Sequence, residues 1–125
     1  MILILDTSIL IELSRGNKDI INKILELKRS YPAPAKISFI SYFEFIYGLR
    51  NKSEKNKKKS MEFIEEFDVI QTSKKTANML VNFKQNYELP LSDLLIASHA
   101  KEVDGVLVTK DRDFKPIKEI ECIIL

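Results

Sequence analysis

The chain has 125 residues, of which 45% are hydrophobic and 30% charged, and its formal net charge is +2. This length suits one domain, over residues 1–125, whose core is large enough to fold without disulfides, and the single cysteine excludes an internal one. No apolar run approaches the ~20 residues of a membrane span, and the first run ends at Asp6, too early for a signal peptide. We therefore expect a soluble, cytoplasmic protein that does not enter a membrane.

Short apolar runs rich in β-branched residues alternate with longer segments of helical period. In chain order, strands are predicted at 2–5, 36–40, 67–71, 105–109 and 120–124, and helices at 7–14, 17–30, 41–50, 54–66, 74–87 and 92–103. Each predicted helix opens on a residue able to cap it: Thr7, Asn17, Ser41, Ser53, Ser73 and Ser92. The alternation predicts an α/β fold with helices on both faces of a mainly parallel sheet of about five strands.

Four acidic residues lie where an apolar run gives way to a turn or a helix: Asp6, Glu44, Asp93 and Asp111. Three of them follow predicted strands, and ligands of open parallel sheets bind at the carboxyl ends of the strands. Ionised carboxylates that converge there repel one another unless a cation neutralises them. Hard divalent cations prefer oxygen ligands, so the pattern predicts a site for Mg²⁺ or Mn²⁺.

Each acid also has an ordinary interpretation, and for any one of them alone that interpretation stays open. Asp6 could cap the following helix, and Ser41 with Glu44 has the spacing of a capping box. Asp93 could complement a helix dipole, while Asp111 and its neighbour Asp113 could be turn residues. The occurrence of all four at corresponding positions favours a shared site.

Other common catalytic arrangements are missing from the sequence. The one histidine, His99, follows Asp93 by six residues and so points away from its helical face. Hydrolases of the Ser-His-Asp and Cys-His types need an imidazole beside the nucleophile, and no glycine-rich loop for phosphate is present. A water activated by a metal ion is the nucleophile that remains.

Four segments together resemble the PIN-domain ribonucleases, and within them the VapC-type toxins of toxin–antitoxin pairs. They are Asp6-Thr7-Ser8, the segment 41–48 (SYFEFIYG), the segment 92–100 (SDLLIASHA) and the segment 107–114 (LVTKDRDF). The order and spacing match over essentially the whole chain, although segment 83–89 lacks the arginine and glycine often found there. The resemblance implies a three-layer α/β/α fold, an endoribonuclease activity that depends on Mg²⁺ or Mn²⁺, and homodimerisation.

The resemblance also implies roles for individual residues. Asp6, Glu44, Asp93 and Asp111 correspond to the catalytic, metal-binding acids of the family, and Asp113 to an auxiliary acid that varies. The hydroxyl residues Thr7, Ser8 and Thr109 correspond to those that support the site. The expected function is hydrolysis of RNA phosphodiester bonds by a VapC-type toxin. A housekeeping RNA-processing nuclease and a non-catalytic PIN-like binding module are the alternatives.

Basic residues near the acids are candidate contacts for RNA phosphates. They are Arg50, Lys52, Lys55, Lys57, Lys58, Lys59, Lys110 and Arg112. A run of charge such as 52–59 is also compatible with an ordinary solvated helix start. The predicted helix 41–50 is apolar around most of its circumference, which a buried position would explain. A dimer interface or a groove for a cognate antitoxin, a candidate partner, would explain it as well.

Overall fold

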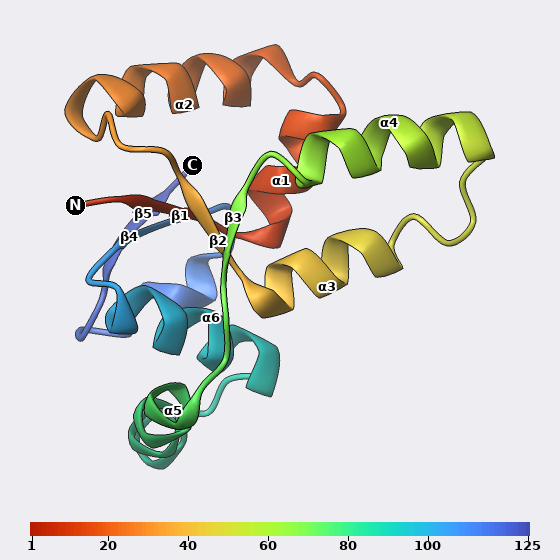
Figure 1. Ribbon diagram of the computed structural model, residues 1–125. Coiled ribbons are helices and arrows are strands. Elements are labelled where there is room, and N and C mark those ends of the chain that lie inside the picture. Colours follow the sequence, from red (N-terminus) through yellow and green to blue (C-terminus); the bar gives the residue numbers. More distant parts are fainter.

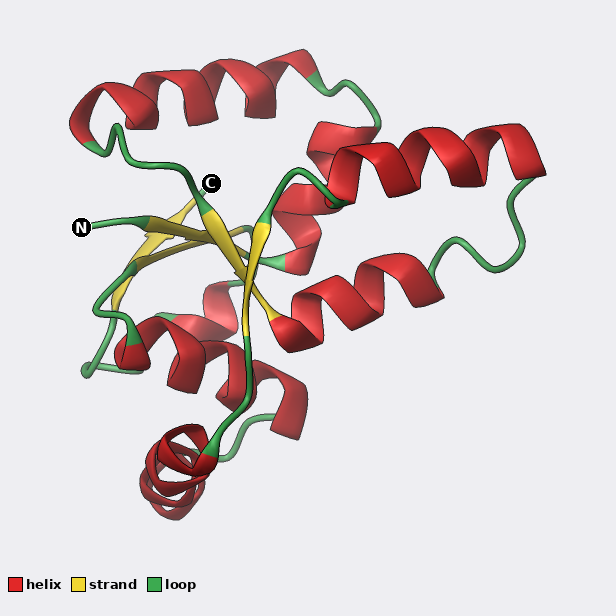
Figure 2. Ribbon diagram, viewed as in Figure 1, coloured by secondary structure: helices red, strands yellow, loops and turns green.

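The computed structural model describes residues 1–125 as a five-stranded sheet with helices on both faces (Figures 1 and 2). All strands are parallel, in the order β3-β2-β1-β4-β5. The strands are β1 (Leu3–Leu5), β2 (Lys36–Ser38), β3 (Asp68–Ile70), β4 (Val106–Thr109) and β5 (Glu121–Ile124). The helices are α1 (Thr7–Ser14), α2 (Lys18–Ser30), α3 (Phe39–Tyr47), α4 (Glu54–Ile64), α5 (Lys74–Asn86), α6 (Leu91–Glu102) and the 3₁₀ helix η1 (Arg112–Phe114).

The two faces of the sheet carry separate hydrophobic cores, because neighbouring side chains of a strand point to opposite sides. Leu3 and Leu5 of β1 join the core under α1 to α4, whereas Ile4 joins the core under α5 and α6. Figure 1 shows α1, α2 and α4 on one side of the sheet and α5 and α6 on the other. The predicted three-layer α/β/α fold is confirmed.

The start of α3 differs from the prediction in a way that matters for Glu44. The strand predicted to reach residue 40 ends at Ser38, and Ser38 caps α3 by accepting a hydrogen bond from the backbone N–H of Ser41 at 3.1 Å. Ser41 is therefore inside the helix, and the predicted capping box of Ser41 and Glu44 is wrong. The Glu44 carboxylate is free to make other contacts.

Two further helix caps also differ from the prediction. Asp6, not Thr7, is the N-cap of α1, and α6 begins at Leu91 after Pro90 with no side-chain cap, so Ser92 is not its cap. The predicted caps Asn17, Ser53 and Ser73 are confirmed. In consequence Asp93 lies in the first turn of α6, where a carboxylate is favoured by the helix dipole.

The strand order determines where a ligand can bind. The central strand β1 pairs with β2 on one side and with β4 on the other, so the chain changes direction across the sheet between these neighbours. In parallel sheets the crevice beyond the carboxyl ends of the strands at such a switch point is the usual binding site. Asp6 follows β1 directly, at this point. None of the helices combines the length and the apolar character that a membrane span requires.

Helix α3 exposes a stripe of three aromatic side chains, which we call the α3 aromatic stripe. Its residues Phe39, Phe43 and Tyr47 follow one another at intervals of four and are 46%, 46% and 55% exposed. Side chains at this spacing share one face of a helix, and the rings of Phe43 and Tyr47 stack at 5.7 Å. The interpretation that α3 is apolar because it is buried inside the molecule is wrong for this face.

Candidate functional site

Four separate elements bring the predicted acids to one edge of the sheet. Asp6 follows β1, Glu44 lies in the middle of α3, Asp93 lies in the first turn of α6, and Asp111 follows β4. Burial, followed by the negative charges of the other three and of Asp113, raises the pKa of Asp93. The four acids therefore lie near enough to interact electrostatically, beyond the carboxyl ends of the central strands.

Asp6 is the most constrained member of the cluster, with only 6% of its surface exposed. Its Oδ1 accepts a hydrogen bond from the backbone N–H of Thr7 at 2.7 Å. Its Oδ2 accepts one from the buried hydroxyl of Thr109 at 2.5 Å and one from Ser8 at 3.3 Å. Burial raises the pKa of Asp6, while the bonds from Thr109, Thr7 and Ser8 act in the opposite direction. Asp6 thus caps α1 and belongs to the acidic cluster at once.

Glu44 is held from a different helix. The hydroxyl of Thr7 donates a hydrogen bond to Glu44 Oε1 at 2.7 Å, across 37 positions of sequence. Since Thr7 follows Asp6, this bond fixes the Glu44 carboxylate relative to Asp6. Thr7, Ser8 and Thr109, the predicted supporting residues, all contact one of the clustered carboxylates.

Asp111 combines a turn with a place in the cluster. Its Oδ1 accepts a hydrogen bond from the backbone N–H of Asp113 at 2.9 Å and so caps η1. Its own N–H donates to the Thr109 hydroxyl at 3.0 Å, and the N–H of Lys110 donates to the Ser8 hydroxyl at 3.2 Å. The second bond ties the loop after β4 to the start of α1, whereas the first holds Asp111 against the end of β4. Asp113 is exposed at the margin of the site.

Asp93 differs from the other three because no hydrogen bond satisfies its side chain. Burial, followed by the charges of Asp111, Asp6, Glu44 and Asp113, raises the pKa of Asp93 to about 6. None of these acids has a lysine, arginine or histidine nitrogen within 4.0 Å, since the ion pairs of the protein are Arg15–Glu12, Lys23–Asp19 and Lys57–Glu54. The cluster carries uncompensated negative charge.

The oxygen atoms of these four carboxylates are of the kind that hard divalent cations such as Mg²⁺ prefer as ligands. A carboxylate has about four acceptor positions; Asp6 uses three of them, Glu44 and Asp111 one each, and Asp93 none. The side chains do not form a closed cage, because no three acidic, histidine or cysteine side chains are arranged to hold an ion. Mg²⁺ does not need one, since it usually keeps several waters and takes one or two carboxylates plus substrate phosphate.

Neither His99 nor Cys122 belongs to this site. His99 is a fully buried residue of α6, where its Nε2 lies 3.2 Å from the Thr72 hydroxyl and burial lowers its pKa. Cys122 lies on the edge strand β5, and burial raises the pKa of its thiol to about 11. The imidazole therefore supplies neither a ligand nor a base, as the sequence predicts.

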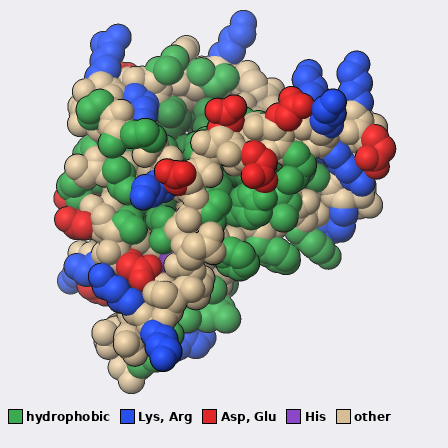
Figure 3. All heavy atoms as spheres, in the orientation of Figure 1, with side chains coloured by type: hydrophobic (Ala, Val, Ile, Leu, Met, Phe, Trp, Pro, Cys, Tyr) green, Lys and Arg blue, Asp and Glu red, His purple; other side chains and the backbone are tan.

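The predicted basic residues fall into two groups. Lys110 and Arg112 are exposed on either side of Asp111, directly beside the carboxylates. The others lie on α4 and on the connection from α3, and in Figure 3 lysine and arginine side chains gather at the outer end of α4. Arg50 covers the ring of Tyr47 at 4.1 Å, and Lys57 pairs with Glu54.

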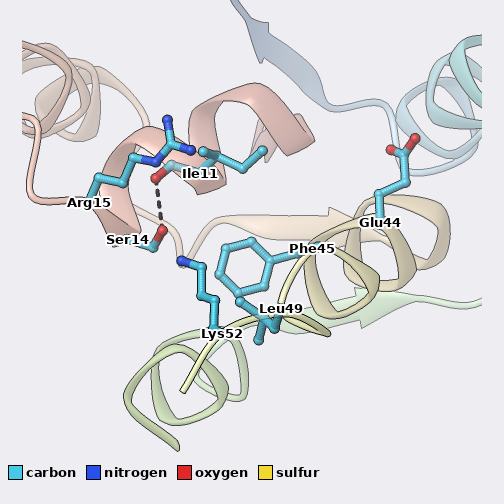
Figure 4. Close-up of a pocket in the computed structure, with 8 residues that line it drawn as sticks. Ile11, Ser14, Arg15, Glu44, Phe45, Leu49 and Lys52 are labelled. Carbon is cyan, nitrogen blue, oxygen red and sulfur yellow. Dashed lines mark hydrogen bonds between the residues drawn. The ribbon is translucent and has the colours of Figure 1, made fainter. Parts of the chain in front are cut away.

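A pocket of about 210 Å³ adjoins the acidic cluster on the side of Glu44 (Figure 4). Arg15 and Lys52 line it together with Phe45 and Leu49, and the Glu44 carboxylate points away from both cations. Arg15 is not among the candidates from the sequence, because it is a single cation at the end of α1 and far from the lysine run. Only the packing of α1 beside α3 reveals it.

Comparison with a family model shows a match to the PIN domain over residues 3–120. Comparison with proteins of curated function gave no match. Among solved structures, VapBC2 from Rickettsia felis bound to a DNA fragment from its promoter has a similar chain, with 27% sequence identity, a TM-score of 0.83, and 100% of this chain and 99% of that chain covered.

Two more similar structures are complexes of the same kind. VapBC-1 from nontypeable Haemophilus influenzae matches at 27% identity and a TM-score of 0.79, covering 99% of this chain and 98% of that one. A toxin–antitoxin complex from Klebsiella pneumoniae matches at 25% identity and a TM-score of 0.79, covering 94% of each chain. The similarity therefore extends over whole chains.

Proposed function

Since the chain belongs to the PIN-domain family, we propose that it is a VapC-type toxin, an endoribonuclease that depends on Mg²⁺ or Mn²⁺. One observation carries the proposal. Asp6, Glu44, Asp93 and Asp111 come from four elements, share one edge of the sheet, and have no cation from the protein to balance them. Such an arrangement destabilises a metal-free protein, so a function that needs the charge explains it best.

Asp6 and Asp93 are the proposed principal ligands, with Glu44 and Asp111 bound directly or through water. Asp93 has the largest unused acceptor capacity, and three hydrogen bonds hold Asp6 rigidly in place. When bound, the divalent ion would lower the pKa of a water and polarise the phosphodiester. Thr7 would keep Glu44 oriented during this chemistry, and Lys110 and Arg112 would approach the phosphate from the rim.

A cognate antitoxin is the proposed protein partner. The similar structures from Rickettsia felis and Haemophilus influenzae are VapBC complexes, and the one from Klebsiella pneumoniae is a toxin–antitoxin complex. A housekeeping RNA-processing nuclease would share the acidic site but would need no such partner. A gene next to this one that encodes a small DNA-binding protein would support the toxin. Co-purification of the two products as a complex would test the pairing.

A homodimer formed through the α3 aromatic stripe is the second proposed assembly. Phe39, Phe43 and Tyr47 are each about half exposed, and Figure 3 shows hydrophobic side chains gathered over α3. A stripe on a single helix can pack against its own copy across a two-fold axis, because the same patch then serves both subunits. Aromatic residues are also enriched in the buried centres of interfaces.

Cleavage of RNA by the purified protein tests the nuclease proposal. We expect cleavage with added Mg²⁺ or Mn²⁺, none with a chelator, and none from the variants Asp6→Asn and Asp93→Asn. Both variants remove a charge while keeping the shape of the side chain, so they should fold. A folded protein that binds RNA but never cleaves it, with either metal, would instead support the non-catalytic binding module.

A further inference from the structure

A basic groove leads away from the acidic cluster, between the end of α1 and the helices α3 and α4. It consists of two adjoining pockets of about 210 Å³ and 370 Å³. They share Ser14, Arg15 and Lys52, so they form one continuous depression. Glu44 lines the inner end of the groove, and Lys59 of α4 lines the outer end. The groove therefore begins at a member of the acidic cluster.

The groove has an apolar floor and a cationic rim. Phe45, Leu49 and Phe63 provide the apolar surface. The exposed side chains of Arg15, Lys52 and Lys59 provide three positive charges. Arg15 lies 3.8 Å from Glu12, a long contact in which the arginine side chain is 68% and the glutamate side chain 19% exposed. Neither lysine has a carboxylate within 4.0 Å, so the two lysines carry positive charge that the protein itself does not neutralise.

The lysines of α4 are not equivalent with respect to this groove. Asn56, Lys59 and Phe63 follow one another at helical intervals and line the groove together. Each residue of a helix turns about 100° from the one before it. Lys58 therefore points to the opposite side of α4 from the groove, although it is the direct neighbour of Lys59 in the sequence. Of the basic residues in segment 52–59, Lys52 and Lys59 line the groove and Lys58 does not.

We propose that this groove binds the single-stranded RNA next to the cleaved bond, with Arg15, Lys52 and Lys59 contacting successive backbone phosphates. This inference rests on the proposed nuclease function. The acidic cluster repels a polyanion, so an RNA substrate needs cations next to the cluster that hold the strand in place. A groove with cations along its rim and an apolar floor suits single-stranded nucleic acid, because the phosphates contact the rim while the sugars lie over the floor.

The test compares matched lysine and arginine variants in RNA binding. The proteins carry Asp93→Asn so that the RNA is not cleaved, and the probe is a short fluorescein-labelled single-stranded RNA of mixed sequence. Fluorescence anisotropy gives the Kd between about 50 and 200 mM salt, where phosphate contacts have their largest effect. The variants are Arg15→Ala, Lys52→Ala and Lys59→Ala, and Lys58→Ala is the control of equal charge change.

Loss of one phosphate contact reduces the slope of log K against log salt by about 0.7 for a single strand, equivalent to about fivefold weaker binding near 0.1 M salt. We expect this change for each of the three groove variants and none for Lys58→Ala, with unchanged melting temperatures. Without Asp93→Asn, the groove variants should raise KM for RNA cleavage and leave kcat unchanged. Equal effects of Lys58→Ala and Lys59→Ala, or no effect of either, would overturn the proposal.

Two further outcomes separate this proposal from its alternatives. If the unmodified protein cleaves no RNA with either metal, the nuclease function fails, but the anisotropy series still decides whether the groove binds RNA. An acidic peptide with the same net charge as the RNA is the second probe. If the groove variants weaken binding of the peptide and leave RNA binding unchanged, the groove is a docking site for a protein and the RNA proposal is wrong.

Discussion

The hydroxyl of Thr7 donates a hydrogen bond to Glu44 Oε1 at 2.7 Å, which joins the first turn of α1 to the middle of α3. Thr7 also donates its backbone N–H to Asp6. One residue therefore sets the positions of two carboxylates of the cluster relative to each other. The site depends on this contact between two helices as well as on the acids themselves.

Replacement of Thr7 by valine should loosen Glu44 without changing the charge of the site. Partners that orient metal ligands typically affect metal affinity or activity by about tenfold to a hundredfold. We expect RNA cleavage by Thr7→Val to decrease by a factor in this range, and the free energy of unfolding to fall by about 1.5–3 kcal/mol with the loss of a bond to a charged group. Thr7→Ser keeps the hydroxyl and should retain most activity. Equal activity of both variants would show that this bond has no role in catalysis.

Replacement of Asp93 by asparagine should stabilise the metal-free protein. The pKa of Asp93 in the folded protein is about 6, above its ordinary 3.8, so its ionised form costs stability. This cost is absent below the ordinary pKa, grows as the pH rises through the folded pKa, and is complete above it. In the presence of a chelator, Asp93→Asn should therefore melt at a higher temperature than the unmodified protein at pH 7. The difference should shrink toward pH 4, and thermal melts over this pH range would detect it.

Gly105 should tolerate no side chain. A Cβ atom at this position would lie 2.7 Å from Cγ1 of Ile4 and 3.2 Å from the carbonyl oxygen of Ile2, both in or next to β1. Overfilling a packed core typically costs about 1–3 kcal/mol, and we expect a loss of this size in the free energy of unfolding of Gly105→Ala. Chemical denaturation would measure it.

Gly48 provides the matched control for that substitution. A Cβ atom there would only reach backbone carbonyls at 3.4 Å, and the φ angle of −65° suits any residue. Replacing such a glycine by alanine restricts the unfolded chain, so Gly48→Ala should gain about 0.4–1 kcal/mol of stability. A similar loss in both variants would contradict the steric explanation for Gly105.

A charge in the α3 aromatic stripe should separate the proposed homodimer. Phe43 lies at the centre of the stripe and is already 46% exposed, so Phe43→Glu should leave the monomer folded. Burying that carboxylate in an apolar interface without a partner is costly, and light scattering should then detect monomers only. Leu25→Glu on α2, at a side chain that is 62% exposed, should not change the assembly. A monomeric unmodified protein at micromolar concentration would refute the dimer.

The amino-acid sequence determined the architecture and the chemical character of the site. Strand and helix periods are local properties of a chain, and hydrophobic alternation alone was enough to predict five parallel strands between helices. The predicted parallel direction of the strands was enough to expect Asp6, Glu44 and Asp111 at one edge, because parallel strands end on the same side of a sheet. The same expectation for Asp93 also required the predicted helix before β4, because Asp93 lies in the first turn of that helix.

Contacts between segments that are distant in the sequence could not be predicted and became visible only in the folded structure. Ser38 and Ser41 are both good caps, and β2 ends at Ser38 because its pairing with β3 ends there, at Ile70. That choice removed Glu44 from a capping box and left it for Thr7. The bond from Thr109 to Asp6 spans 103 positions, and Arg15 reaches the groove only because α1 lies beside α3. Local sequence patterns do not predict such long-range contacts, because they depend on how the helices and strands pack around the core.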